Sequence, residues 1–155
     1  MAFTNFGDFA HHQGGASSIG PQASAAAASF GLTGSSVDLL TTEGIVSAWV
    51  AAGITSGSPT NFTVTAKLQE STTGSGSWTD VTGGALPVIG PITSATAITD
   101  AYVSTIQRTK RYVRIVATVA FTAGTSPTVG VFGGVISQLK IAGTGAGYSL
   151  APTTA

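Results

Sequence analysis

The strongest constraint on this chain is an alternation of apolar and polar residues with a period of two. Residues 61–71 place Phe62, Val64 and Leu68 on one side, with Thr, Lys and Gln residues between them. Residues 112–122 repeat the pattern with valine, isoleucine and alanine. Successive side chains of a strand point to opposite faces, so this pattern predicts two half-buried antiparallel strands.

Shorter apolar runs after residue 34 indicate further strands, with Gly, Ser and Pro clusters between them. These strands are expected at residues 36–42, 45–56, 78–81, 95–106 and 128–141. Residues 83–91 contain three glycines and two prolines and are expected to form turns. No run has the period of a long amphipathic helix. The sequence therefore predicts an all-β fold: an antiparallel β-sandwich or jelly roll of about seven or eight strands.

Residues 1–34 lack this alternation and carry one acidic residue and no basic residue. Gly, Ser and Pro interrupt them often, and we interpret them as an extended N-terminal arm. The sandwich domain is then expected at residues 35–142 and a flexible C-terminal tail at residues 143–155. Large apolar side chains in the arm are expected to dock on this subunit, on a neighbour or on a partner shell. They are Phe3, Phe6, Phe9 and Phe30.

Charged residues make up only 8% of the chain, whereas an ordinary soluble protein has roughly 25%. Six basic residues balance six acidic ones, so the formal net charge is zero. A surface with so little charge resists association poorly, and we expect copies of this chain or a partner to cover much of it. Zero net charge also argues against nucleic-acid binding, which needs many phosphate-neutralising side chains.

The sequence also argues against membrane insertion and secretion. The longest apolar stretch, at about residues 45–54, is short of the roughly 20 residues that a spanning helix needs. No Lys or Arg precedes Lys67, so the basic start of a secretory signal is missing. We therefore expect a protein that is made in the cytoplasm and contacts no membrane.

Four of the six basic residues fall within residues 108–114. They are Arg108, Lys110, Arg111 and Arg114. One interpretation is an electrostatic contact with an acidic partner surface, for which Arg108, Lys110 and Arg111 are the candidate residues. The other is a charged strand end that blocks edge-to-edge aggregation. The sequence supports the two interpretations about equally.

The residue types that catalysis and metal binding need are scarce. The chain has no cysteine, which excludes disulfides and thiolate metal sites. Its two histidines, His11 and His12, are adjacent in the predicted arm, where a catalytic base would lack rigid support. We therefore expect no enzyme activity and no cofactor. Asp8 and the two histidines are suitable metal ligands, although a polar patch in an arm is the simpler interpretation.

Three aromatic residues, Trp49, Trp78 and Tyr112, could form a platform on which sugar rings stack. Such residues more often fill a core or an interface. Trp78 follows the Gly- and Ser-rich residues 74–77, and exposure beside that loop would keep a glycan-binding role open. Glu70 and Asp80 flank the same loop and could approach each other, which is typical of a closed turn.

The sequence AKLQES at residues 66–71, WTDV at 78–81 and KRYVRIV at 110–116 resembles small virion proteins of tailed phages. In these head-decoration and capsid-cement proteins, a strand reading LQES, a Gly/Ser hairpin and W-x-D-V precede a strand reading RYVR. The resemblance covers roughly the C-terminal two-thirds of the chain. It rests on hairpin rhythm and composition and carries over no catalytic residue.

The resemblance implies a jelly roll or related sandwich that oligomerises and sits over joints between capsomers. The expected function is that of a structural protein on the capsid exterior that binds the phage major capsid protein. A homotrimer is favoured, with a dimer as the close alternative. A receptor- or glycan-binding module and a tail or neck protein are the competing hypotheses. Deleting residues 1–34 is expected to abolish shell binding and leave the sandwich folded.

Overall fold

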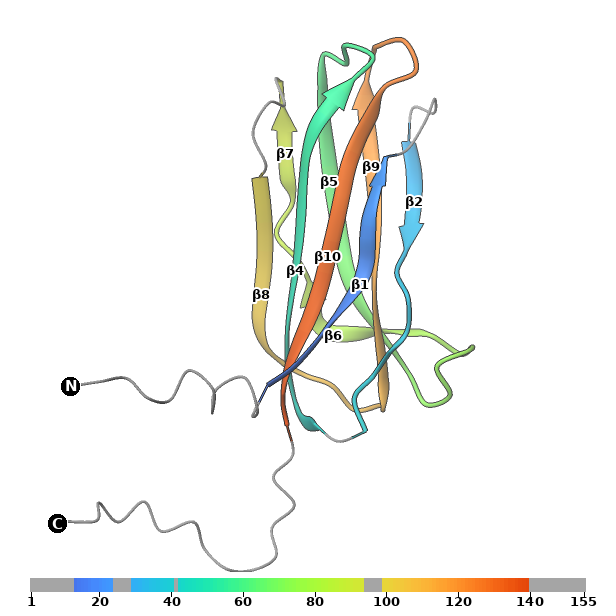
Figure 1. The fold of residues 1–155 in the computed structure, drawn as a ribbon, viewed down its shortest axis with the longest axis vertical. Coiled ribbons are helices and arrows are strands. Elements are labelled where there is room, and N and C mark those ends of the chain that lie inside the picture. The colour runs from blue at the N-terminus through green and yellow to red at the C-terminus, as the bar shows by residue number, and fades with distance from the viewer. Residues whose placement is uncertain (1–12, 24–28, 41, 94–98, 140–155) are drawn as a thin grey trace, which may run out of the picture.

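The computed structural model describes residues 13–23, 29–40, 42–93 and 99–139. In these ranges the backbone forms ten strands and no helix (Figure 1). The strands are β1 (Gln13–Ala23), β2 (Ser29–Thr33), β3 (Val37–Asp38), β4 (Thr42–Ser56), β5 (Asn61–Ser71), β6 (Thr79–Ala85), β7 (Ile89–Ile92), β8 (Thr99–Gln107), β9 (Tyr112–Thr122) and β10 (Thr128–Leu139). Since the described part holds no helix at all, none there could span a membrane.

The strands form two antiparallel sheets that pack face to face (Figure 1). Sheet A has the order β1-β10-β4-β8. Sheet B has the order β2-β9-β5-β6, with β3 also paired to β9 and β7 also paired to β5. The predicted all-β antiparallel sandwich is therefore confirmed, with more strands than the seven or eight expected.

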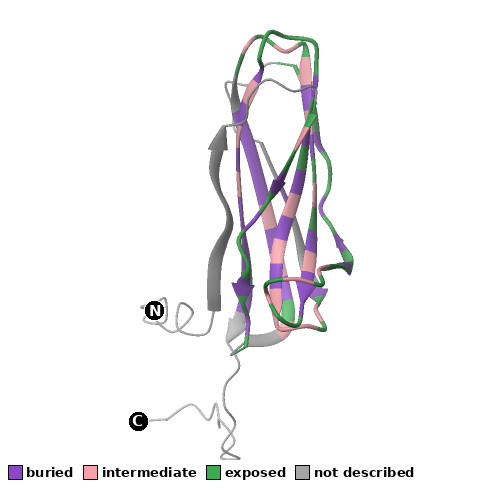
Figure 2. Ribbon diagram, turned by 90° about the vertical axis from the view of Figure 1, so that its right-hand side faces the viewer, coloured by how far each residue is buried: buried purple, intermediate pink, exposed green. Residues whose placement is uncertain are grey.

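The core lies between the sheets and is built by the alternation read from the sequence. On β5 and β9, Phe62, Leu68 and Ile115 are at most 1% exposed. They face valines from β4 and β10, among them Val50 and Val131, which are fully buried. Figure 2 shows buried residues alternating with half-buried and exposed ones along these strands. Alternation therefore divides each strand between core and surface as expected.

Gly133 on β10 allows the backbone of the neighbouring strand β4 to approach closely. A Cβ atom at this position would lie 2.6 Å from the carbonyl oxygen of Trp49 and 3.4 Å from Cδ1 of Ile115. The first is a neighbour in sheet A and the second belongs to sheet B. Any side chain larger than hydrogen would therefore push β10 away from its surroundings.

Two expectations about local structure were wrong. Residues 83–91 were expected to form turns, but they include the end of β6 and most of β7. Strand β7 forms because Ile89 is buried in the core and pairs with Val64 of β5. The backbone accommodates the turn residues by a cis peptide bond at Gly90–Pro91 and a register shift in the β5–β7 ladder.

The predicted boundary of the arm at residue 34 was also wrong. Strand β1 pairs along β10, with Gln13 opposite Gln138 and Ala23 opposite Gly130. Strand β2 pairs along β9. Both segments are therefore part of the sandwich, because their backbone groups complete the hydrogen bonding of sheet edges. Residues 1–12 and the predicted tail at 143–155 lie outside the described residues.

Candidate interaction surfaces

The predicted basic cluster lies in the connection from β8 to β9 and in the first residues of β9. Arg108 is held against the backbone: Nη1 donates to the carbonyl oxygen of Lys110 at 2.7 Å, and Nη2 donates to that of Leu39 at 2.8 Å. These bonds tie the β8–β9 connection to the segment after β3. The guanidinium of Arg108 therefore has a structural role within the subunit.

Glu70, which is only 6% exposed, also holds the β8–β9 connection in place. Its carboxylate accepts hydrogen bonds from the backbone N–H of Thr109 at 2.7 Å, the hydroxyl of Thr109 at 2.6 Å and the N–H of Lys110 at 3.1 Å. Burial alone would raise the pKa of Glu70, but these bonds outweigh it and hold the pKa below its ordinary value. The carboxylate is thus charged and satisfied at neutral pH.

Arg111 forms a two-point ion pair with Asp38 of β3. Nε lies 2.8 Å from Oδ1, and Nη2 lies 2.5 Å from Oδ2. The hydrogen bond from Arg111 lowers the pKa of Asp38, and the ion pair raises the pKa of Arg111. The guanidinium also lies 4.8 Å from the ring centroid of Tyr112. Because its charge is largely matched by Asp38, Arg111 offers little attraction to an acidic partner.

A second polar network crosses the outer face of sheet B from β6 to β9. Asp80 accepts from Nζ of Lys67 at 2.7 Å and from Nε2 of Gln69 at 2.9 Å. Gln69 in turn accepts from Nε and Nη2 of Arg114 at 3.1 and 2.8 Å. The bonds from Lys67 and then Gln69 lower the pKa of Asp80. The network joins β5, β6 and β9 near a register shift between β5 and β6.

These contacts determine how the other predicted residues are placed. Nζ of Lys110 donates to Oγ1 of Thr79 at 2.5 Å. Glu70 and Asp80 do not meet. Asp80 pairs with Gln69 and joins the outer network, whereas Glu70 points to the β8–β9 connection and bonds Thr109. Among residues with described side chains, no three His, Asp or Glu residues gather to hold a metal. Asp8, His11 and His12 lie outside the described residues.

The three aromatic residues considered for sugar binding do not form one platform. The guanidinium of Arg114 lies 4.2 Å from the ring centroid of Trp78 and covers one of its faces. Tyr112 is covered by Arg111 on one side, and Gly74 packs so closely that a Cβ there would lie 2.8 Å from Cδ1 of the tyrosine ring. Trp49 belongs to the opposite sheet.

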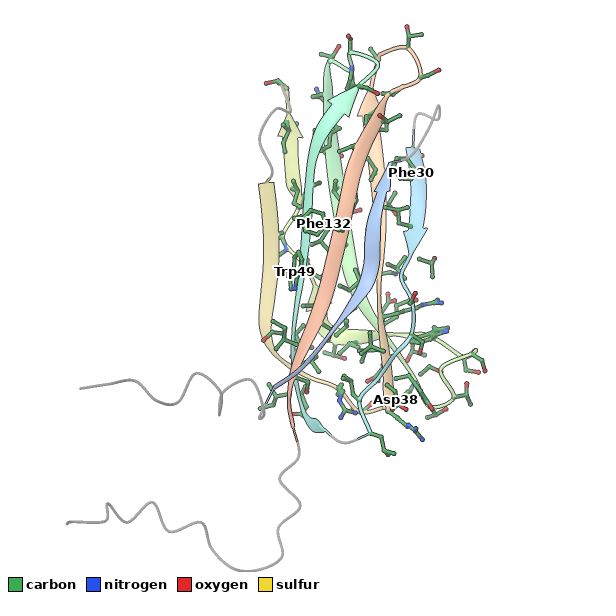
Figure 3. All side chains as sticks on the ribbon, viewed as in Figure 1. Phe30, Asp38, Trp49 and Phe132 are labelled. Carbon is green, nitrogen blue, oxygen red and sulfur yellow. The ribbon has the colours of Figure 1, made fainter. Side chains whose placement is uncertain are left out.

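Trp49 is part of an apolar surface that the sequence analysis did not identify. Its ring lies edge-on to Phe132, with centroids 5.4 Å apart at 85° (Figure 3). Ile45 and Ile136 are 47% and 40% exposed. Neither aromatic ring belongs to the core cluster, whereas their sequence neighbours Val50 and Val131 do. We call this surface the outer face of sheet A. It comprises Ile45, Ser47, Trp49 and Ala51 of β4, and Phe132, Gly134 and Ile136 of β10.

The signal for this surface was present in the sequence. Strands β4 and β10 read IVSAWVA and VFGGVI, with apolar residues at consecutive positions instead of alternating ones. A strand that is apolar on both sides is typical of a sheet covered on both faces. The corresponding outer face of sheet B is polar by contrast. It carries Thr63, Thr65, Lys67, Gln69, Arg114, Thr118 and Thr122, with the apolar residues Val116 and Ala120 among them.

Of the four phenylalanines predicted to dock, Phe30 is described. It lies on β2, is half-buried and packs against the core, with its ring centroid 6.0 Å from that of Phe121. Its place on β2 is marked in Figure 3. Docking on its own subunit was one of the three alternatives, and Phe30 takes it. Phe3, Phe6 and Phe9 lie outside the described residues.

No protein-family profile and no curated protein sequence matches this chain. Among solved structures, it is similar to a chain in the structure of infectious bursal disease virus, Gx strain, with 9% identity and a TM-score of 0.56. The match covers 88% of this chain and 34% of that chain, so this chain spans about a third of the length of the viral one. The two share a jelly-roll-like β-sandwich fold.

Two further solved structures are more distant. One is the C-terminal family 22 carbohydrate-binding module of Xyn10B from Clostridium thermocellum, with 14% identity, a TM-score of 0.36, and coverage of 76% of this chain and 86% of that one. The other is from Desmodium yellow mottle tymovirus, with 12% identity, a TM-score of 0.30, and coverage of 82% and 93%. Scores below 0.5 do not establish a shared fold.

Proposed function

We propose that this protein is a structural virion subunit that binds the outer surface of a tailed-phage capsid and stabilises contacts between major capsid proteins. It acts without catalysis or a cofactor, as a homo-oligomer, and binds neither nucleic acid nor membrane. The observation that carries the proposal is the distribution of charge. Every charged side chain that the structure describes lies on sheet B or in the loops next to it and is bonded within the subunit, whereas the residues named on the outer face of sheet A carry no charge.

This distribution of charge suits a protein that functions within a larger assembly. Charges bonded within the subunit contribute to its rigidity and leave few free charges to keep copies apart in solution. A cluster of exposed apolar residues marks an interaction surface, because isolated soluble proteins rarely maintain one. The similarity of the fold to a virus chain agrees with a place in a virion, although many functions share such sandwiches.

Attachment to the shell is assigned to the segment before β1. It carries Phe3, Phe6 and Phe9 and no basic residue. It joins sheet A at Gln13, the position paired with Gln138 near the end of β10. Each phenylalanine that becomes buried on a capsid would contribute roughly 1.5–3 kcal/mol before the cost of ordering the segment. Binding of many copies over a closed shell then stabilises the shell, because the subunit binds the assembled lattice and not the separate capsid proteins.

The direct test mixes the purified protein with empty capsids that lack it. We expect co-sedimentation that saturates at a fixed number of copies per capsid, and density on the exterior of the capsid by electron cryomicroscopy. A triple substitution of Phe3, Phe6 and Phe9 by serine should abolish binding, because none of these residues belongs to the described sandwich. The matched control is Phe30→Ser. It removes a phenylalanine that packs on its own subunit, and its effect should be on stability.

The location of the density for this chain in an intact virus particle separates the competing functions. Density on the tail or neck would replace the capsid role with one elsewhere in the particle. Glycan binding that depends on Trp78 would favour a receptor-binding module, and it would require Arg114 to leave the ring face that it now covers. Protein that neither saturates capsids nor appears on their exterior would overturn the proposal.

A further inference from the structure

The outer face of sheet A has the composition of the centre of a protein–protein interface. It presents two aromatic rings and two exposed isoleucines, and between Ile45 and Ala51 of β4 and between Phe132 and Ile136 of β10 it carries no charged residue. Aromatic enrichment and depletion of charge are the features that mark interface centres. Two acidic positions adjoin these residues: Glu43 near the start of β4, and Asp100 on the edge strand β8, where it pairs with Ala51.

The face is also large enough for a stable contact. Sheet A has four strands, and a spacing of about 4.8 Å between strands makes it about 19 Å wide. Strand β10 has 12 residues, which at about 3.3 Å each gives a length of about 40 Å. The whole sheet, with the edge strands β1 and β8 beside the seven residues named above, therefore has a footprint of about 750 Å², close to the roughly 800 Å² that each partner buries in a standard interface.

The relief of the face allows it to pack against a copy of itself. Trp49 and Phe132 form a raised pair, and Ala51 beside them is only 4% exposed. Next to this pair the face is flat, because Gly134 of β10 lies opposite Trp49 and Gly15 of β1 lies opposite Ile136. A two-fold axis through the face would set the ring pair of one copy over the glycines of the other.

We propose that a second copy of this chain covers this surface, so that two sandwiches pack through the outer faces of their A sheets. A contact between identical faces is isologous and closes at two copies, which selects a dimer over a trimer. The residues named on the two central strands carry no charge, so a self-contact centred on them brings no like charges together at its centre. This inference rests on the homo-oligomer of the proposed function and specifies it: the dimer would carry two N-terminal segments and could bind two capsid proteins at once.

Sedimentation equilibrium of the full chain over a range of micromolar concentrations tests the dimer. We expect twice the mass of one chain. Ile136→Asp and Ile45→Asp should each weaken the dimer by at least about tenfold, because each would bury an unpaired carboxylate. The matched control is Val88→Asp, which places the same charge at a residue that is 58% exposed outside this face. It should leave the mass unchanged, and circular dichroism would check that each variant is folded.

Spin labels locate the contact independently of these variants, since the chain has no cysteine of its own. A label at Ser47→Cys lies on the proposed interface, where sheets stack about 10 Å apart. A label at Thr118→Cys lies on the outer face of sheet B. In the dimer the two labelled positions would be about 30 Å apart, because three sheet spacings separate them. Pulsed electron paramagnetic resonance should therefore give a shorter distance between the two labels at position 47 than between those at position 118.

Four results would contradict the proposed dimer. A monomer at every concentration, a trimer, a dimer insensitive to both aspartates, or a shorter distance at position 118 would do so. The capsid role fails separately. A strictly monomeric protein that still saturates capsids removes the dimer and the homo-oligomer but leaves the capsid role, whereas a dimer that does not bind capsids removes the capsid role and leaves the dimer.

Discussion

Glu70 holds Thr109 by two hydrogen bonds, one from the backbone N–H at 2.7 Å and one from the side-chain hydroxyl at 2.6 Å. Glu70 lies near the end of β5 and Thr109 lies in the connection from β8 to β9, 39 positions apart in the sequence. Through this pair, the end of β5 positions the connection that carries Arg108 and Lys110. The predicted basic cluster therefore depends on a buried acid for its shape.

Replacing Glu70 by alanine should lower the free energy of unfolding by about 2–3 kcal/mol, because the N–H groups of Thr109 and Lys110 lose a charged acceptor. Chemical denaturation of the variant and the wild-type protein measures the difference. The control is Asp80→Ala, which removes an exposed acid with fewer buried partners and should cost less. Equal losses for the two variants would contradict the structural role of Glu70.

The stability of the protein should fall in acid. The folded-state pKa of Glu70 lies below its ordinary value, so its contribution is complete above the unfolded-state pKa of about 4.3. The contribution is lost as the pH falls through the lower folded value. Unfolding midpoints between neutral pH and strong acid should show this loss, and Glu70→Gln should reduce the slope. Asp38 and Asp80, whose pKa values are also lowered, should maintain the remaining slope.

Truncation should distinguish the segment before β1 from the sandwich. A chain that begins at Gln13 should fold, because it retains every described strand. A chain that lacks residues 1–34 loses β1 and β2 and exposes the backbone of β10 and β9, so we expect it to aggregate or unfold. Circular dichroism and thermal unfolding of the two truncated chains check this. A cooperative melt of the shorter chain would mean that β1 and β2 are dispensable.

Two glycines make a matched pair for testing how closely β10 packs against its surroundings. Gly133→Ala should cost about 1–3 kcal/mol, the range found for overpacking, because its Cβ would lie 2.6 Å from a carbonyl oxygen. Gly31→Ala on β2 meets nothing within 4 Å, and alanine in a strand should be neutral or stabilising by up to about 1 kcal/mol. Thermal unfolding of both variants should show opposite signs or a clear difference.

The basic cluster should contribute little to attachment on a capsid. Arg111 is matched by Asp38, and Arg108 is bonded to backbone carbonyls. Capsid binding should therefore change little between low and high salt, and Arg111→Gln should bind as the wild type does. The binding isotherms at two salt concentrations measure this. A steep loss of affinity with salt would instead support the electrostatic contact with an acidic partner that the sequence left open.

The strands that were predicted well are those with a local signal. The bounds of β5 and β9 agree with the alternation at residues 61–71 and 112–122. Strand β1 reads QGGASSIGPQA and gives no such signal. It becomes a strand because β10 offers it unpaired backbone groups, and that opportunity exists only in the folded sheet.

The same division applies to the candidate surfaces. The four basic residues at 108–114 could be recognised from the sequence, but their partners could not. Asp38 is 73 positions from Arg111, and no periodic pattern links them. The contact of Trp49 with Phe132 likewise joins β4 to β10 across the chain. Its signal, two strands apolar on both sides, indicated a covered face without saying which residues meet.

The sequence by itself determined the all-β class, the alternation that builds the core and the scarcity of charge, because each is a property of residue types and short spacings. The tertiary structure decided that residues 13–33 belong to the sandwich, that the basic cluster is bonded within the subunit, and that the apolar residues of β4 and β10 form one outer face. These depend on strand order and register, which are set by contacts between residues far apart in the chain.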